Sequence, residues 1–533
     1  MTNFTFTHND YIEDRFFLRI GNFISHNIEK IISILSLIGA VIATIISYQH
    51  GWILAYGDAE SHINISKEVI NGLTPGFAQL GGIWLPLTHV MMIPFIIYDP
   101  LWRTGLGGSI VSGIFYSITC VYIFKLTKLI TKHTVASFIA FLIFATNLNI
   151  LYLQSTPMTE VPLIAFFVLS SYYFVKYLYK IKSLPSLILA GLFALCASLT
   201  RYDGWFLVAC EAFFIIVPGL LNRRIFTRKK GDVILFATLA GFGILCWLVW
   251  CLLIFNNPLY FSDSIYSAKS QQLAWMQRNE LPGYHHLLIS LIYYVYTCLE
   301  NSGFIIFIIS FVGAIVFAAS RSSRAALAIL SILFVPFIFN VLSLFLGQSV
   351  IFIPSLTPKD YLYHLFNVRY GVTMIPFMAI FSGYLLSKIP HSLKALVIGL
   401  LIAQTYFFFA GMTPAITLAD GTTGLSAQKV PINVENFIDK NYKGGYVLLD
   451  SYARTISIAK STIPMQEIIY VGNKPYWDIS LKHPEKYAQW IIMQKNDVVW
   501  TALYDNPVER GELYKYFKKV YTSNQILIFK RNS

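Results

Sequence analysis

Acidic and histidine side chains gather in one short polar stretch, residues 56–62, which reads YGDAESH. Asp58 and His62 would share one face of a helix, because they are four residues apart. Glu60 would diverge from Asp58 on a helix, but the two could converge from a loop. A carboxylate held between a membrane surface and a protein cavity is a candidate general base, because partial desolvation raises its pKa. The alternative is a solvated loop with helix-capping acids.

Further charged residues stand at the ends of later apolar runs. Glu160 lies in QSTPMTEVP, where it could act in chemistry or simply stabilise the first turn of a helix. Arg201 and Asp203 lie in LTRYDGW and could form a local ion pair or part of a site. Arg369 and Tyr370 lie in FNVRYGVTMIP. The planar guanidinium of an arginine suits a phosphate, so Arg369 is a candidate anion ligand.

Several other chemistries find no support in the sequence. It contains no phosphate loop of the GxxxxGK[ST] type, no HExxH helix and no G-x-S-x-G turn. The six cysteines lie in or beside apolar runs without a metal-type spacing. The adjacent histidines at 285–286 would not face each other on a helix. We therefore predict no metal site from the residues.

Composition places the chain in a membrane. Of its 533 residues, 56% are hydrophobic and only 13% are charged, whereas soluble domains carry about a quarter. A net charge of +13 could indicate nucleic acid, but most Lys and Arg residues lie in short loops between apolar runs. That pattern is typical of the cytoplasmic loops of a multi-pass protein. We predict an integral membrane protein that binds no nucleic acid.

About eleven apolar runs are long enough to cross a bilayer, which takes about 20 residues. They are residues 31–48, 107–124, 134–152, 161–178, 184–200, 205–221, 233–255, 303–320, 325–346, 371–387 and 393–410.

Two more apolar stretches, 83–98 and 286–299, fit helices lying at the outer interface. Counting the first as a span would put Lys125, Lys128 and Lys132 outside, against the positive-inside trend. The first also carries prolines that suit a bent segment. Eleven spans with a cytoplasmic N-terminus place the C-terminus and residue 58 outside.

The chain after about residue 412 has a different pattern. Residues 444–450, 466–472, 497–504 and 525–531 look like short strands, 487–494 could be helix or strand, and 509–521 looks like an amphipathic helix. We predict two domains, a membrane domain over 1–411 and a soluble, extracytoplasmic α/β domain over 412–533.

These features together resemble the GT-C glycosyltransferases, and within them the protein O-mannosyltransferase and lipid A aminoarabinose transferase group. The resemblance rests on an acidic motif directly after the first helix (GDAESH), an acid in the second outer loop (TEVP) and a late R-Y-x(5)-P element. Asp58, Glu160, Arg369, Tyr370 and Pro376 match these motifs, whereas the second acid of the first motif is displaced to Glu60.

The resemblance implies a GT-C-like helical bundle with outer juxtamembrane helices. It also implies an enzyme that transfers a sugar from a polyprenyl-phosphate-linked donor to an acceptor hydroxyl at the outer face, by inverting displacement. Asp58 would be the general base, and Arg369 and Arg201 would bind the phosphate. The predicted catalytic residues are Asp58, Glu60 and Glu160, and the predicted substrate-binding residues are His62, Trp84, His89, Arg201, Asp203, Arg369 and Tyr370.

Two other functions compete with this one. A lipid or oligosaccharide transporter or flippase would need charges in mid-span and broken helices, whereas these acids lie near helix ends. A diphosphate-lipid-dependent oligosaccharide ligase would need a metal ion or a further phosphate-binding arginine. No cofactor is predicted, a divalent metal stays an open alternative, and the sequence does not specify the sugar, the acceptor or the oligomeric state.

Overall fold

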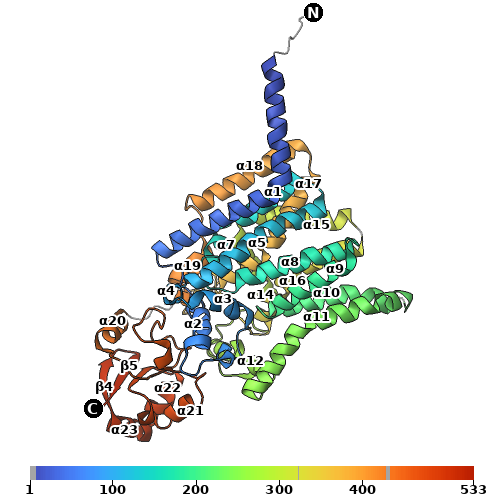
Figure 1. The fold of residues 1–533 in the computed structure, drawn as a ribbon. Coiled ribbons are helices and arrows are strands. Elements are labelled where there is room, and N and C mark those ends of the chain that lie inside the picture. The colour runs from blue at the N-terminus through green and yellow to red at the C-terminus, as the bar shows by residue number, and fades with distance from the viewer. Residues whose placement is uncertain (1–7, 222, 322, 428–431, 533) are drawn as a thin grey trace, which may run out of the picture.

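The computed structural model describes residues 8–532 apart from 222, 322 and 428–431. Long helices stacked side by side make up most of the chain, and a small sheet lies at one end of the stack (Figure 1). All eleven predicted runs are helical. They correspond to α1 (His8–Gln49), α5 (Leu106–Thr131), α6 (Thr134–Ala145) with α7 (Leu148–Leu153), α8 (Glu160–Leu178), α9 (Ser183–Ser198), α10 (Asp203–Leu221), α11 (Arg223–Phe255), α15 (Phe304–Ser320), α16 (Arg324–Phe345), the 3-10 turn η2 (Val368–Met374) with α17 (Ile375–Lys388), and α18 (His391–Phe409).

Many of these helices have the length and composition of membrane spans. Seven in the described part of the chain qualify singly, and an eighth span arises if α14 (Leu287–Ser302) and α15 are taken together. Those two helices meet at an angle of 114°. α6 and α9 are apolar but shorter. The predicted mainly helical, multi-pass membrane fold is confirmed.

The predicted span 134–152 is two helices rather than one. α6 ends at Ala145, and α7 restarts at Leu148 after a turn. The Asn147 side chain accepts a hydrogen bond from the Ile150 backbone at 3.1 Å, which caps α7. Its amide nitrogen donates to the Asn301 carbonyl at 2.8 Å. An asparagine that caps a new helix and bonds to a distant segment ends the first helix there.

Short helices follow the first long helix. They are α2 (Gly57–Asn71), α3 (Leu87–Ile96) and α4 (Asp99–Arg103). α3 has ten residues, which make about 15 Å of helix. That is about half the thickness of the hydrocarbon core of a bilayer. Pro94 lies inside α3. This agrees with the prediction that 83–98 is not a full span. Three more short helices occur later in the chain: α12 (Tyr260–Asp263), α13 (Ala268–Gln277) and α19 (Ile416–Thr423).

Burial separates central from peripheral spans. In the most apolar 18-residue stretch of α8, 78% of the residues are buried. In the corresponding stretch of η2 with α17, 89% are buried. The corresponding figures for α1, α11 and α18 are 22%, 22% and 17%. The exposed apolar residues of the last three helices suit contact with lipid. The start of α8 and the η2 turn therefore lie on the most enclosed elements of the bundle.

The C-terminal part forms a five-stranded mixed sheet. Its strands are β1 (Val447–Leu449), β2 (Ile468–Ile469), β3 (Trp490–Gln494), β4 (Phe517–Thr522) and β5 (Ile526–Arg531), in the order β2-β1-β3-β5-β4. The pairs β1–β2 and β1–β3 are parallel, and β3–β5 and β4–β5 are antiparallel. The helices α20 (Ile432–Asn441), α21 (Tyr476–Ser480), α22 (Val498–Trp500) and α23 (Pro507–Tyr516) flank it.

Two of the predicted elements in this region are wrong. Residues 497–504 form α22 and a π-helical turn rather than a strand, because the Asp497 carboxylate accepts the Trp500 backbone N–H at 2.6 Å and caps a helix. Residues 509–521 are not one helix. α23 ends at Tyr516, and the chain continues as β4, where Phe517 is buried and pairs with Arg531.

The two faces of the sheet pack differently. Leu448, Ile491 and Phe529 belong to a core formed within the C-terminal part, which also contains Trp477. Their neighbours Val447 and Ile492 belong instead to the main core, which is continuous with the helical bundle. The sheet therefore lies against the rest of the chain.

Candidate active site

The acidic stretch forms the first turns of α2. Tyr56 precedes the helix in an extended conformation, and Asp58 and Glu60 occupy the first turn, where acids favour the helix dipole. Two residues along a helix correspond to a rotation of about 200°, so these carboxylates point to opposite sides. The Asp58 side chain is 40% exposed, whereas Glu60 is buried. The sequence left two outcomes open, divergence on a helix or convergence from a loop, and the segment is helical.

Arg369 joins Asp58 to Glu160. Its Nη2 donates to Asp58 Oδ2 at 2.5 Å, and its Nε donates to Glu160 Oε1 at 3.1 Å. Arg369 is only 4% exposed and lies in η2, after Asn367, which has a positive φ of 55°. Glu160 is the first residue of α8 and is fully buried. Residues far apart in the sequence thus meet at the ends of three helical elements.

Arg201 binds the same carboxylate from another side. Its Nη1 donates to Glu160 Oε1 at 3.0 Å, and its Nε donates to Asp203 Oδ2 at 3.3 Å. Glu160 Oε2 and Asp203 Oδ1 are buried without a hydrogen-bond partner among the described residues. Glu160 therefore bridges the two guanidinium groups through one oxygen and has a second that can still accept. A further donor, from a ligand or from water, would satisfy such an oxygen.

Aromatic rings enclose the two arginines. The Tyr370 ring lies 5.1 Å from the Arg369 guanidinium and 5.3 Å from that of Arg201. The Tyr56 ring lies 5.0 Å from Arg369. These distances are typical of cation–π contacts. The rings limit the directions from which an anion can reach the guanidinium groups.

Two participants were not predicted from the sequence. The Tyr56 hydroxyl donates to the Thr417 carbonyl at 2.8 Å and to Asp420 Oδ2 at 3.2 Å, from α19. Burial raises the pKa of Asp420 to about 6, against the opposing effect of Arg369. Nothing in the local sequence LADGTT distinguishes this aspartate. Only its closeness to Tyr56 in space does so.

His62, one turn after Asp58 on α2, forms a separate cluster with Trp84 from the following loop and His89 from α3. His62 Nδ1 lies 2.9 Å from His89 Nε2, and the His62 and Trp84 rings are 4.7 Å apart. Burial lowers the pKa of His62 to about 3 and the pKa of His89 well below its usual range. Both imidazoles are therefore neutral at pH 7. His89 Nδ1 is buried without a partner among the described residues.

Glu60 binds the C-terminal region. Ser457 Oγ donates to Glu60 Oε1 at 2.9 Å, and the Ala459 backbone N–H donates to the same oxygen at 3.1 Å. Arg454 Nη2 lies 3.6 Å from Glu60 Oε2. The Arg454 guanidinium packs directly over Gly57, where a Cβ would collide with it. This predicted catalytic residue thus faces away from the arginine cluster.

The structure therefore brings together Asp58, Glu160, Arg201, Asp203, Arg369 and Tyr370, here called the arginine cluster. Formally it holds two cations and three carboxylates. The most exposed of these charged groups is Asp58. Within the described residues, no group of three or more His, Cys, Asp or Glu side chains is placed to hold a metal ion.

Part of the chain is similar to a known protein family. The sequence profile of the dolichyl-phosphate-mannose-protein mannosyltransferase family matches residues 103–250. This segment runs from the end of α4 into α11 and includes Glu160, Arg201 and Asp203. Among curated proteins, no sequence matches the chain.

The fold is shared with a solved structure. ArnT from Cupriavidus metallidurans bound to undecaprenyl phosphate is similar with a TM-score of 0.51 and 11% identity, over 92% of this chain and 97% of that chain. The Archaeoglobus fulgidus oligosaccharyltransferase in complex with Zn and sulfate has a TM-score of 0.48 and 10% identity. The match covers 94% of this chain and 73% of that chain. The predicted resemblance to the GT-C glycosyltransferases is confirmed: the chain is similar to protein mannosyltransferases in sequence over residues 103–250, and it is similar to ArnT in fold.

Proposed function

We propose that the chain transfers a sugar from a polyprenyl-phosphate-linked donor to an acceptor hydroxyl at the outer face of the membrane. The observation that carries this is the arginine cluster. Two enclosed guanidinium groups converge on Glu160 beside the half-exposed Asp58, at the ends of central spans. The family match supports mannose-type chemistry, and the ArnT structure contains undecaprenyl phosphate.

The membrane location suits such a donor. Its long chain would stay in lipid beside the exposed apolar helices, while its phosphate reaches the helix ends. Arg369 and Arg201 would hold the phosphate through charge-assisted hydrogen bonds, which are stronger than neutral ones. As the bond between the sugar C1 and the phosphate oxygen breaks, negative charge grows on that oxygen. Fixed guanidinium groups stabilise this charge without having to reorganise.

Donor binding would also free the base. Asp58 is the exposed partner of Arg369, whereas Glu160 is the buried one. An incoming phosphate would therefore displace Asp58 from Arg369 and leave the contact with Glu160 in place. A carboxylate that loses its cationic partner becomes a stronger base. Asp58 would then take the acceptor proton as the hydroxyl oxygen attacks C1 from the face opposite the phosphate, which inverts that centre.

Glu160 and Asp203 would position the two arginines. Each carboxylate bonds to Arg201, and Glu160 also bonds to Arg369. The domain division at residue 411 and the extracytoplasmic placement of 412–533 are also part of this proposal. Their support is that Ser457 and Ala459 hydrogen-bond to Glu60 on α2, the helix that also carries Asp58.

The direct test uses the purified full-length protein with a polyprenyl-phosphate sugar and native membranes as the source of acceptor. We expect the lipid phosphate to be released and the sugar to appear with inverted configuration. A product of retained configuration, or transfer from a nucleotide sugar alone, would contradict the proposal. Cysteine placed at Lys128 should resist labelling from outside intact cells, since the proposed orientation puts this residue in the cytoplasm.

A further inference from the structure

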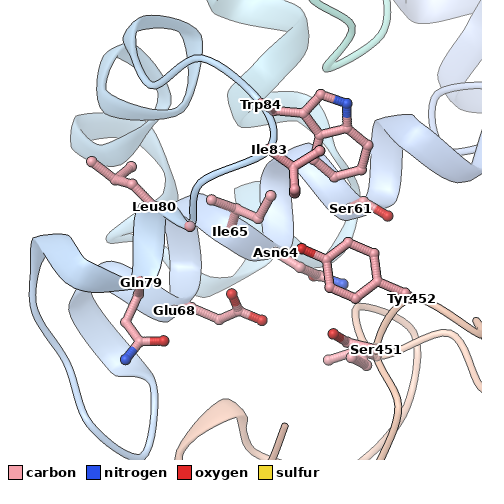
Figure 2. A pocket seen from close by; sticks show the side chains of 12 residues that line it. Ser61, Asn64, Ile65, Glu68, Gln79, Leu80, Ile83, Trp84, Ser451 and Tyr452 are labelled. Atoms are coloured by element: carbon pink, nitrogen blue, oxygen red, sulfur yellow. The ribbon is translucent and has the colours of Figure 1, made fainter. Parts of the chain in front are cut away.

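A pocket outside the arginine cluster lies between α2, the loop after it and the C-terminal region. Ser61, Asn64 and Glu68 line it from α2, Trp84 lies in the loop, and Tyr452 lies in the C-terminal region (Figure 2). Its empty space is about 540 Å³, including the part that is open to solvent. The enclosed part of this space is about 60 Å³, so a bound molecule would extend into the part that is open to solvent.

One wall of the pocket offers uncharged hydrogen-bonding groups. Asn64 Oδ1 accepts from Trp102 Nε1 at 2.9 Å, which fixes the orientation of the amide. The Glu68 side chain points into the space (Figure 2) and is 3% exposed. Burial raises the pKa of Glu68 to about 8, against a hydrogen bond with Tyr470, so this carboxyl is mostly neutral at pH 7. A neutral carboxyl can both donate and accept.

The opposite wall is aromatic. The Trp84 and Tyr452 rings have centroids 6.4 Å apart, and the Tyr266 ring stacks on Tyr452 at 4.3 Å. The three rings come from three separate segments of the chain. Tyr452 is 36% exposed, so part of the residue is accessible from the pocket.

The chemistry of the lining selects among ligands. Among the described residues that line the pocket, none is a lysine, an arginine or a histidine. An anionic group would therefore find no cation there, in contrast with the arginine cluster. A purely apolar chain would cover Ser61, Asn64 and Glu68 without forming hydrogen bonds with them. A saccharide ring has apolar C–H faces and hydroxyl groups at its edge, which match an aromatic wall and a neutral polar wall.

The pocket follows the same side of α2 as Asp58. At about 100° per residue, Ser61, Ile65 and Glu68 lie within about 80° of the direction of Asp58, and Asn64 lies about 120° away on the same flank. Ser61 is one turn away, about 4.5 Å along the helix axis. A ring bound against Ser61 would bring one of its hydroxyl groups toward Asp58.

We propose that this pocket is the acceptor subsite and takes the ring of an uncharged saccharide, whose hydroxyl points to Asp58. This rests on the proposed function. In the reaction, the acceptor oxygen forms a bond to C1 of the donor sugar, and the bond between C1 and the phosphate oxygen breaks. The phosphate leaves with the electron pair, and the acceptor proton passes to Asp58. No further reactant is needed.

The test measures binding of methyl glycosides of neutral hexoses and pentoses to the full-length protein in detergent, by saturation-transfer NMR and titration. We expect saturable binding of at least one glycoside. Tyr452→Ala should weaken it by about tenfold, the size expected when a ring contact is lost. Tyr452→Phe should retain it. Tyr516→Ala, at a 47% exposed residue of α23, is the matched control and should change nothing.

Binding of undecaprenyl phosphate, measured on the same preparations, separates this inference from the proposed function. Lipid that binds equally well to Tyr452→Ala and wild type shows that the variant is folded. If the lipid binds and no glycoside does, or if Tyr452→Ala binds glycosides as wild type does, the acceptor inference is overturned. A serine- or threonine-rich peptide that binds in place of the glycosides would overturn it as well. Glycosides that bind where the lipid does not would support the pocket and contradict the proposed donor.

Discussion

Asp58 and Glu60 are two residues apart on α2, yet they lie in opposite surroundings. Asp58 is 40% exposed and bonds to Arg369, which lies in a central span of the bundle. Glu60 is buried and bonds to Ser457, Ala459 and Arg454 of the C-terminal region. Helix geometry alone separates them, because successive side chains turn by about 100°.

This difference assigns two tasks to one acidic motif. The face of α2 with Asp58 meets the arginine cluster, the face with Glu60 bonds to residues 454–459 of the C-terminal region, and the pocket lies between these two faces. A single helix thus joins the arginine cluster to the C-terminal region. Substitutions of Asp58 and Glu60 should therefore have different effects on the protein.

The largest effect is expected for Asp58→Asn. The amide keeps the shape of the side chain but cannot take the acceptor proton, so turnover should fall by about 10²–10⁴-fold. Release of lipid phosphate from the donor in native membranes measures this. Binding of undecaprenyl phosphate should persist, because an uncharged amide competes less than a carboxylate for Arg369. Asp478→Asn, at a 57% exposed residue of the C-terminal region, is the control. Near wild-type turnover would remove Asp58 as the base.

The next effect is expected for Arg369→Lys. Lysine keeps the charge but loses the planar pair of donors that spans Asp58 and Glu160. Loss of a charged hydrogen bond should weaken undecaprenyl phosphate binding by about 10–100-fold. Titration of the lipid into detergent-solubilised protein measures it. Arg278→Lys, at a 46% exposed ion pair with Glu280, should bind as wild type does. Equal affinities in all three proteins would exclude Arg369 from the phosphate site.

A smaller effect on turnover, under about tenfold, is expected for Glu60→Gln, because this residue does not touch the reacting atoms. The neutral oxygen of glutamine still accepts from Ser457 and Ala459, but it loses the attraction of Arg454. Amide hydrogen exchange at residues 457–460 should become faster, since the segment is held less tightly. A dead Glu60→Gln enzyme with unchanged exchange would mean that Glu60, and not Asp58, is the base.

The smallest effect concerns pH. The folded pKa of Glu68, about 8, lies above its ordinary value of 4.5, so the folded state holds the proton more tightly. The unfolded state loses its proton first, and stability therefore falls as pH rises from about 4.5 to 8 and levels off above that. Glu68→Gln should lose less Tm over this range than wild type. Parallel Tm curves would mean that Glu68 is already ionised in the folded protein.

The sequence indicated most of the arginine cluster because its members stand at helix ends in a recognisable order. Asp58, Glu160 and Arg369 match motifs, and Arg201 with Asp203 stands beside an apolar run. The partners of Glu60 could not be predicted, since Ser457 lies 397 positions away in a loop without a pattern. Asp420, Glu68 and Tyr452 were missed for the same reason. Their roles depend on burial and on long-range contacts, which local periodicity does not encode.

The helices were also easier to predict than the strands. Length and hydropathy mark a span directly, whereas residues 497–504 and 509–521 carry strand-like and helix-like patterns that capping and pairing override. The break at Asn147 belongs to the same class, because its bond to the Asn301 carbonyl comes from a distant segment.

The most direct test of the central claim is a density map of the full-length protein with undecaprenyl phosphate. We expect the phosphate about 3 Å from nitrogens of Arg369 and Arg201. Asp58 should be released from Arg369 and face the pocket, while Glu160 stays bonded to both arginines. A phosphate bound elsewhere, or one bound while Arg369 still holds Asp58, would contradict the account.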